Sequence, residues 1–189
     1  MTPSTYKRWQ QASILSALKT RRVLVLAGSR QCGKTTLAKE IAGEDAIFRT
    51  LDDVTLLEAA LSDPHGFVHH NDNLMIIDEV QKAPVLLQAV KQDVDNKQAP
   101  GRFLLTGSAN IQSLPGVTES LAGRVSKIRL RPLALGEIAG KPPQFLANAF
   151  QNKFEVDESM SADDHYSLKD HYLLKAISGG YPEALRQEN

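Results

Sequence analysis

The apolar residues of this chain form short runs that alternate with segments of helical periodicity. The runs at residues 23–27, 74–77 and 103–105 are unbroken, the run at residues 47–51 is a moderate signal, and the run at residues 125–130 is weaker and alternates with polar residues. Short runs rich in Val, Ile and Leu are typical of strands that are buried on both faces, as in a parallel sheet. Helical spacing of apolar residues occurs at residues 14–18, 35–42, 54–61, 85–94 and 118–122. Strands that alternate with helices predict an α/β fold with right-handed crossovers.

The composition and pattern of the sequence change after Arg131. Prolines and glycines cluster at positions 132, 136, 140, 142 and 143, which is typical of a junction. Residues 151–164 are polar and predict a loop or a weak helix, and the helical pattern of residues 165–178 ends at two glycines. We therefore divide the chain into a core domain, residues 1–135, and a second region, residues 136–189.

Composition limits the classes of protein to which the chain can belong. The 189 residues are 42% hydrophobic and 23% charged, as in ordinary globular proteins. Lys plus Arg and Asp plus Glu both number 22, so net charge does not support nucleic acid as a partner, although it does not exclude a local basic patch. The lone cysteine, Cys32, excludes an intramolecular disulfide and favours a reducing compartment. With a polar N-terminus and only short apolar runs, the sequence predicts a cytoplasmic protein that does not interact with a membrane.

A phosphate-binding motif follows the first apolar run. Residues 28–35 fit the pattern G-x-x-x-x-G-K-[ST], and the expected binding residues are Gly28, Ser29, Arg30, Gln31, Cys32, Gly33, Lys34, Thr35 and Thr36. The glycines let successive backbone N–H groups face the phosphates, and the helix that begins near Gly33 turns its positive end toward the anion. Lys34 would reach the β- and γ-phosphates, and the Thr35 hydroxyl would bind Mg2+. The motif predicts binding of ATP or a close nucleoside triphosphate; a chance glycine turn is the alternative, and the flanking strand and helix argue against it.

Two carboxylates, Asp78 and Glu79, end the third apolar run. Phosphoryl transfer needs an acid that holds hydrated magnesium and often a second one that polarises the attacking water, and Asp78 and Glu79 fit these roles in that order. The alternative is a solvated helix start, where acidic residues are also favoured. The phosphate loop upstream favours the catalytic interpretation. A glutamate beside the magnesium ligand indicates a hydrolase rather than a small-molecule kinase.

Polar residues also follow the fourth apolar run. Thr106, Ser108 and Asn110 would lie at the carboxyl end of a strand, where ligands bind in parallel sheets, so any of them is a candidate to orient water or contact the γ-phosphate. Ordinary turn chemistry explains the same residues, since turns favour Gly, Ser and Asn. Both interpretations stay open at this stage.

Several segments together resemble a group of prokaryotic AAA-type ATPases. The resemblance is carried by residues 26–37, 77–82, 105–110, 120–124 and 179–183, and an Arg-Gln pair inside the phosphate loop is its hallmark. It implies a P-loop fold of three layers with a parallel five-stranded sheet in the order 5-1-4-3-2, followed by a partial helical lid. It also implies a further C-terminal domain of unassigned function, which we expect these 189 residues to lack, as a short form or a fragment.

The resemblance further implies roles for three residues. Ser108 becomes the candidate sensor, and Arg124, just before the fifth strand, becomes a candidate arginine finger through which a homo-oligomer is expected to complete its sites. Pro182 belongs to a Gly-x-Pro element whose proline packs on the nucleotide. Arg124 and Pro182 also have simpler explanations. Arg124 fits a surface arginine at a helix end, and the Gly-x-Pro element fits a helix stop followed by a turn.

Three weaker signals have structural explanations. Lys127, Arg129 and Arg131 alternate with apolar residues and are interpreted as the solvated face of an edge strand rather than a nucleic-acid surface. The histidines at positions 65, 69 and 70 fit no zinc pattern and are expected on the surface. Cys32 is expected to be a tolerated small side chain within the loop.

The sequence leaves three functions to compare. The first is Mg2+-dependent ATP hydrolysis by an AAA-type domain, with Glu79, Lys34, Arg124 and Ser108 as catalytic residues. The second is a nucleotide-dependent switch with little or no hydrolysis. The third, a transferase of the nucleotide-kinase kind, is disfavoured by the Asp78-Glu79 pair and by the Arg-Gln loop. The macromolecular target is not encoded in any recognised motif.

Overall fold

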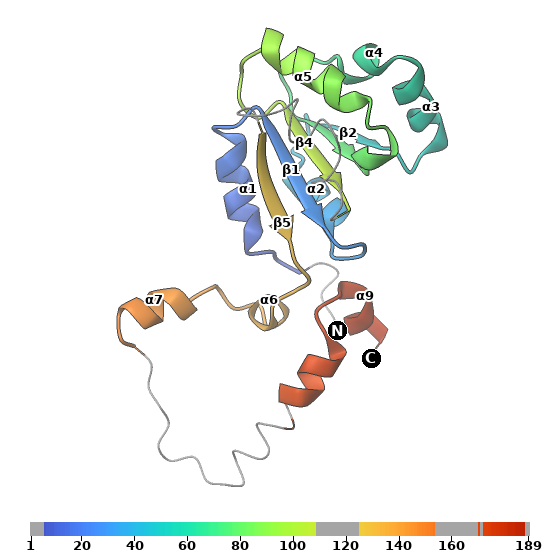
Figure 1. Ribbon diagram of the computed structural model, residues 1–189. Helices are drawn as coiled ribbons and strands as arrows, with labels where there is room; N and C mark the ends of the chain where they lie inside the picture. The colour runs from blue at the N-terminus through green and yellow to red at the C-terminus, as the bar shows by residue number, and fades with distance from the viewer. Residues whose placement is uncertain (1–5, 109–124, 154–169, 171, 188–189) are drawn as a thin grey trace. The chain divides into compact units, whose positions relative to one another are not determined.

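A five-stranded parallel sheet forms the centre of the unit of residues 10–131, which contains the phosphate loop. The computed structural model describes residues 6–108, 125–153, 170 and 172–187. The five strands are β1 (Val23–Gly28), β2 (Ile47–Thr50), β3 (Met75–Asp78), β4 (Phe103–Gly107) and β5 (Val125–Leu130). They pair in parallel in the order β2-β3-β4-β1-β5, which is the predicted order read from the other end (Figure 1). Every predicted strand is therefore confirmed, with bounds that differ by at most two residues.

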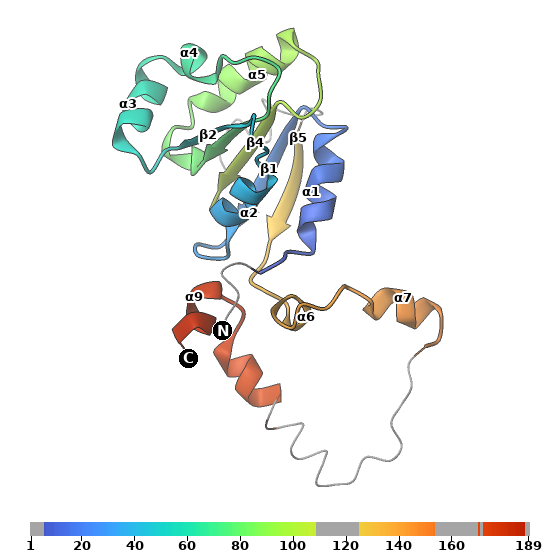
Figure 2. The same ribbon diagram turned by 180° about the vertical axis from the view of Figure 1, so that it is seen from behind.

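Helices cover both faces of this sheet, and the three layers are confirmed. The helices are α1 (Gln10–Leu18), α2 (Lys34–Ile41), α3 (Val54–Ser62), α4 (Pro64–Val68) and α5 (Leu86–Asn96), with a short 3-10 helix, η1 (Val80–Lys82). Helices α1 and α2 lie on one face, and α3, α4 and α5 lie on the other (Figures 1 and 2). The sequence pattern missed α4 and η1 because each has five residues or fewer.

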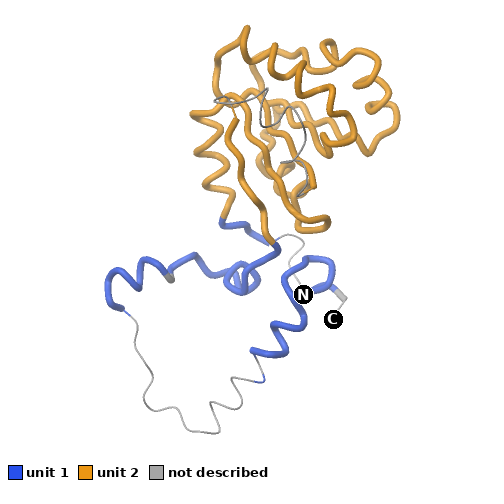
Figure 3. Tube along the Cα trace, viewed as in Figure 1, with its two compact units in different colours: residues 1–9, 132–189 blue, residues 10–131 orange. Residues whose placement is uncertain are grey.

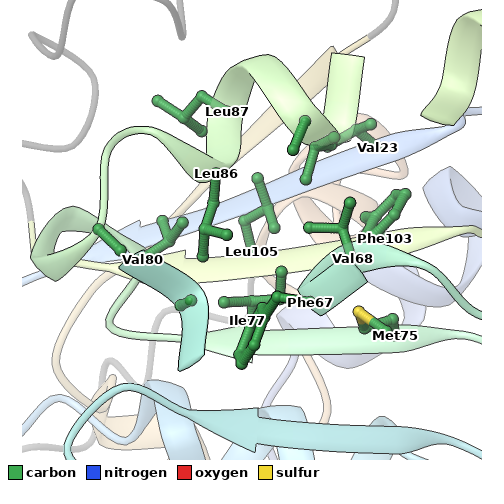
Figure 4. Close-up of a cluster of buried hydrophobic side chains, with 14 of the residues drawn as sticks. Val23, Phe67, Val68, Met75, Ile77, Val80, Leu86, Leu87, Phe103 and Leu105 are labelled. Carbon is green, nitrogen blue, oxygen red and sulfur yellow. The ribbon is translucent and has the colours of Figure 1, made fainter. Parts of the chain in front are cut away.

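The unbroken apolar run of β1 follows from its central place in the sheet. Val25, Ala27 and Val23 (the last labelled in Figure 4) pack with α5 and the side chains of its layer, whereas Leu24 and Leu26 pack with α1 and α2. Because successive side chains of a strand point to opposite faces, a strand covered on both sides needs apolar residues at every position. All six residues of β1 are buried.

The chain divides into two compact units, one of residues 10–131 and the other of described residues among 1–9 and 132–189 (Figure 3). The second unit contains α6 (Leu135–Ile138), α7 (Phe145–Phe150), a helical segment at residues 172–178 and α9 (Pro182–Gln187). In it, the buried Arg8 Nε lies 3.3 Å from Glu137 Oε1, and Glu137 also accepts from the backbone N–H of Trp9 at 2.8 Å. Residues 118–122, predicted to be helical, lie outside the described residues. Within the described part of the chain, no helix is long and apolar enough to cross a bilayer.

The structure shows where the residues of two weaker sequence signals lie. Strand β5 is an edge strand, and Lys127, Arg129 and Arg131 are exposed, as expected. The interpretation of His70 as a surface residue is wrong, although His65 and His69 are indeed exposed. His70 is only 5% exposed because the segment between α4 and β3 carries it against the ring of Phe103.

His70 belongs to a buried charged cluster at the amino end of β4. Arg102, which has no exposed surface, donates to Asp93 at 2.6 Å and to the carbonyl oxygen of Asn71 at 3.1 Å. The Nδ1 atom of His70 lies 2.8 Å from the carbonyl oxygen of Val68, which can only accept, and 3.5 Å from Arg102 Nη2, which can only donate; the shorter contact favours the tautomer in which Nδ1 carries the hydrogen. The Nε2 atom is buried and has no hydrogen-bond partner among the described residues.

We expect this cluster to make the protein less stable in mild acid. Burial, and then the charge of Arg102, lower the pKa of His70, while the hydrogen bond to Val68 and the charge of Asp93 oppose them. A histidine with a lowered pKa in the folded state takes up its proton more readily after unfolding, so stability is complete above about pH 6.5 and falls below it. The urea midpoint should therefore decrease between about pH 7.5 and about pH 5.5, and it should decrease less in His70→Phe.

The matched control is His65→Asn, which changes an exposed histidine on α4. It should keep the pH dependence of the parent. If His70→Phe and the parent showed the same pH dependence, the loss of stability in mild acid could not be assigned to His70.

Candidate functional site

The loop between β1 and α2 has the backbone that a phosphate-binding loop requires. Gln31 (φ 62°) and Gly33 (φ 95°) both adopt the left-handed conformation. Gln31 is not a glycine, so this conformation is uncommon for it, and uncommon conformations cluster at functional sites. A side chain at Gly28 would lie 2.5 Å from the carbonyl oxygen of Leu130 and 2.9 Å from Cys32 Sγ, so glycine is required there for the loop to pack on β5.

Helix α2 begins at the end of this loop, with Gly33 as its N-cap residue. Its first backbone N–H groups have no partners within the helix, so the positive end of the helix dipole faces the loop. The Lys34 side chain is buried, and its Nζ atom donates to the carbonyl oxygen of Ser29 at 2.9 Å. The ammonium group therefore folds back along the loop rather than into solvent.

The carboxylate of Asp78 is the most densely hydrogen-bonded group of the site. Asp78 is 1% exposed. Thr35 Oγ1 lies 3.1 Å from its Oδ1 and 3.0 Å from its Oδ2, and Thr50 Oγ1 lies 3.4 Å from Oδ2. Thr106 also donates to Oδ1. Three hydroxyl groups from α2, β2 and β4 thus converge on one buried carboxylate.

The register of the sheet explains this convergence. Thr50 is paired with Asp78 in the β2–β3 ladder, and Ile77 is paired with Leu105 in the β3–β4 ladder, so Thr106 comes next along β4. Side chains at such neighbouring positions on adjacent strands point to the same face about 5 Å apart. Thr35 reaches the group from the first turn of α2.

The donor set of Thr35 and Asp78 fits a magnesium ion. Mg2+ prefers oxygen ligands at 2.0–2.1 Å in octahedral geometry, so two adjacent ligands lie about 2.9 Å apart. The separations of 3.0 and 3.1 Å between Thr35 Oγ1 and the Asp78 oxygens are close to this value. No group of three or more His, Cys, Asp and Glu residues that could hold a metal occurs among the described residues. A magnesium ion here would therefore need phosphate oxygens and water as its other ligands.

Glu79 stands next to this carboxylate in an unusual conformation. Its φ is 59°, in the left-handed region, and its backbone N–H donates to Thr106 Oγ1 at 3.3 Å. Thr106 therefore connects both acidic residues, as a donor to Asp78 and as an acceptor from Glu79. The Glu79 side chain is half-buried and accepts a hydrogen bond from Gln81 Nε2.

The remaining predicted residues are placed as follows. Arg30 and Thr36 are exposed, and Ser108 is half-buried directly after β4. The thiol of Cys32 is buried, and its Sγ atom lies 3.7 Å from the carbonyl oxygen of Leu130. Pro182 begins α9 in the other unit, and Arg124 lies outside the described residues. The structure thus brings Lys34, Thr35, Asp78 and Glu79 to one edge of the sheet.

Sequence reasoning missed Thr50 and Gln81 as members of the site. Thr50 ends β2, and a polar residue at the carboxyl end of a predicted strand was the available signal. Gln81 follows Glu79 by two residues in η1, and no spacing rule places it on the carboxylate. Thr106 was one of three candidates for contact with the nucleotide, and in the structure it is fully buried against Asp78.

Comparisons with known sequences give relatives for most of the chain. A family model described as AAA domain matches residues 20–139. Two similar proteins are uncharacterized proteins of Mycobacterium bovis and Mycobacterium tuberculosis, each 34% identical over 155 residues. The match covers 76% of this chain and 35% of each relative, so the chain spans only a minor part of their length.

Solved structures show a similar fold. The Walker-type ATPase of Pyrococcus abyssi has a TM-score of 0.50 and 13% identity, with 82% of this chain and 61% of that chain covered. AMPPCP-bound DnaA from Aquifex aeolicus has a TM-score of 0.54 and 14% identity, with 93% of this chain and 57% of that chain covered. At these identities the likeness supports the P-loop fold and nothing finer.

We expect Thr106→Val to destabilise the protein although it preserves the shape of the side chain. The substitution removes the hydroxyl that donates to buried Asp78 and accepts from the Glu79 backbone. Loss of a hydrogen bond to a buried charged group costs about 1–3 kcal/mol in the free energy of unfolding. Urea denaturation measures this change, and Thr106→Ser, which keeps the hydroxyl, is the matched control. Equal stability of the parent and Thr106→Val would show that the hydroxyl does not support the carboxylate.

Proposed function

The chain belongs to the AAA domain family, and from this membership we propose that it binds ATP with Mg2+ and hydrolyses it. The observation that carries the proposal is the contact between the Thr35 hydroxyl and the Asp78 carboxylate beside the phosphate loop. A hydroxyl from the start of a helix and a carboxylate from a strand end form the magnesium-binding pair of P-loop nucleotide hydrolases. Asp78 ends β3, and Thr35 lies in the first turn of the helix that follows β1, so both groups are at the carboxyl-end edge of the sheet, where such folds bind ligands.

The binding step is assigned to the loop and to the start of α2. Backbone N–H groups from Gly28 to Thr36 would hold the phosphates, aided by the positive end of the helix. Lys34 would leave its contact with Ser29 and place its ammonium group against the β- and γ-phosphates. Bound Mg2+ would supply positive charge that offsets the negative charge of the phosphates. Thr35 and Asp78 would hold that ion, directly or through its water.

The chemical step is assigned to Glu79. Its carboxylate would accept a proton from a water molecule while the water oxygen attacks the γ-phosphorus. The bond between the γ-phosphorus and its bridging oxygen would break and leave ADP and phosphate. Ser108, at the end of the neighbouring strand β4, is the proposed sensor of the γ-phosphate. Pro182 is proposed to pack on the nucleotide, on the strength of the Gly-x-Pro resemblance alone.

A nucleotide-dependent switch with little hydrolysis is the second candidate. It is favoured by the length of the relatives, since this chain covers only 35% of each. A domain of that kind would bind ATP and change its conformation while other parts of a longer protein respond. The lone Cys32 supports a reducing compartment for either function, and we propose the cytoplasm.

Lys34→Ala should weaken ATP binding strongly. It removes the cation that the loop supplies, and the ammonium group is buried beside the loop backbone. Isothermal titration calorimetry with ATP and Mg2+ measures the affinity. Lys39→Ala, which changes an exposed lysine of the same helix, is the control and should keep the parent affinity. Unchanged ATP affinity in Lys34→Ala would contradict the proposal that the phosphate loop is the binding site.

Glu79→Gln should preserve ATP binding and abolish most turnover. Glutamine has the same size but cannot accept the proton of the water, and loss of a catalytic base costs about a hundredfold or more in rate. Phosphate release with and without Mg2+ measures turnover. The control is Glu58→Gln, an exposed glutamate of α3. Turnover at the parent rate would exclude Glu79 as the base, and binding without turnover in the parent would favour the switch.

Arg124 is proposed as an arginine finger that completes a neighbouring subunit's site. In that case specific activity rises with protein concentration, and Arg124→Ala lowers turnover while ATP binding persists. A mixture of Glu79→Gln and Arg124→Ala subunits should recover part of the activity, because some interfaces then pair an intact base with an intact finger. Activity independent of concentration, with no recovery on mixing, would contradict action in trans.

A further inference from the structure

The side chain of Gln81 holds the carboxylate of Glu79. Gln81 lies in η1, two residues after Glu79, and its Nε2 atom donates to Glu79 Oε2. Both side chains are half-buried. Gln81 contacts the proposed base without belonging to the phosphate loop or to the magnesium pair.

The backbone of Glu79 is fixed independently of this contact. Its N–H donates to Thr106 Oγ1 at 3.3 Å, and its carbonyl oxygen accepts from the backbone N–H of Lys82 at 3.0 Å. Its φ of 59° sets the direction in which the side chain leaves the strand. The freedom that remains is rotation about the side-chain bonds of Glu79, and the Gln81 amide restricts this rotation.

The orientation of the Gln81 amide follows from its neighbour. An ionised carboxylate only accepts hydrogen bonds, so the NH2 group of Gln81 must face Glu79 and the amide oxygen must face away. That oxygen, Oε1, is buried and has no hydrogen-bond partner within the part of the chain that the structure describes. A buried acceptor without a partner is unfavourable, and an apolar side chain of the same shape would avoid the cost. Folding stability alone therefore does not explain a glutamine here.

We propose that Gln81 is a positioning residue for ATP hydrolysis: its amide holds one oxygen of Glu79 so that the other is directed at the attacking water. This inference rests on the proposed function and deepens it. Gln81 makes no direct contact with the substrate in this role and acts through Glu79. A small misplacement of a reacting group is enough to lower a rate about a hundredfold, so a single hydrogen bond that limits rotation of the base affects turnover.

Steady-state kinetics of three full-chain variants test the role. Gln81→Leu keeps the shape without a donor, Gln81→Glu keeps the shape with a charge that repels Glu79, and Gln81→His keeps an N–H group at about the same reach. We expect kcat of the Leu and Glu variants to fall about tenfold to a hundredfold, with KM for ATP within about threefold of the parent. The His variant should recover part of the loss. Gln88→Leu, at an exposed glutamine of α5, is the matched control and should keep the parent kcat.

The outcomes separate this inference from the proposed function. A parent that releases no phosphate from ATP overturns both. A parent that is active and loses turnover in Glu79→Gln, but not in Gln81→Leu or Gln81→Glu, overturns the role of Gln81 alone. A loss of kcat accompanied by an equal loss of ATP affinity also overturns it, because the residue then supports binding rather than the base. Thermal unfolding of each variant identifies any that fail to fold, and the remaining variants then decide the question.

Discussion

The buried carboxylate of Asp78 is the interaction on which the arrangement of the site depends. A carboxyl group that is 1% exposed is costly to bury unless it is hydrogen-bonded, and three threonine hydroxyls satisfy it. These hydroxyls come from α2, β2 and β4, elements that are distant in sequence. One carboxylate therefore ties the start of the helix after the phosphate loop to two strands of the sheet. If Mg2+ joins Thr35 and Asp78, it enters a site that the fold has already assembled.

The phosphate loop is supported from its other side by β5. The buried thiol of Cys32 and the absence of a side chain at Gly28 both bring the loop close to the carbonyl oxygen of Leu130. The loop thus lies between the edge strand and the start of α2, and the left-handed conformations of Gln31 and Gly33 give it the necessary turn. Such a loop presents its backbone in a fixed shape before any ligand binds, which reduces the entropy lost on binding.

The two ends of the central strands serve different purposes. At the amino end of β4, Arg102 is fully buried and paired with Asp93 of α5, in a cluster that includes His70. At the carboxyl ends, Asp78 and Glu79 are arranged beside the phosphate loop. Breaking a buried ion pair by removing one partner is strongly destabilising, so the first cluster holds α5 to the sheet. The second combines two acidic residues with the left-handed backbone of Glu79, and backbone conformations of this kind cluster at functional sites.

The sequence by itself determined the class of the fold, its strands and the chemistry of the loop. Continuous apolar runs are a local signal of strands buried on both faces. The phosphate loop is a contiguous motif. Both can therefore be recognised from the sequence without a structure. The order of the strands came from resemblance to a family, and the sheet confirms it. Short elements such as α4 and η1 were missed because a few residues carry too little periodicity.

Only the tertiary structure decided which side chains meet. Thr50 and Thr106 reach Asp78 because of the register between parallel strands, and a shift of one residue would turn each threonine to the opposite face. Gln81 reaches Glu79 because Glu79 adopts a left-handed conformation that no sequence pattern encodes. His70 is buried because the segment after α4 packs its ring on Phe103, although its neighbours in sequence are exposed. Contacts of this kind depend on the geometry between elements, whereas the motif and the strands depend on residues that are adjacent along the chain.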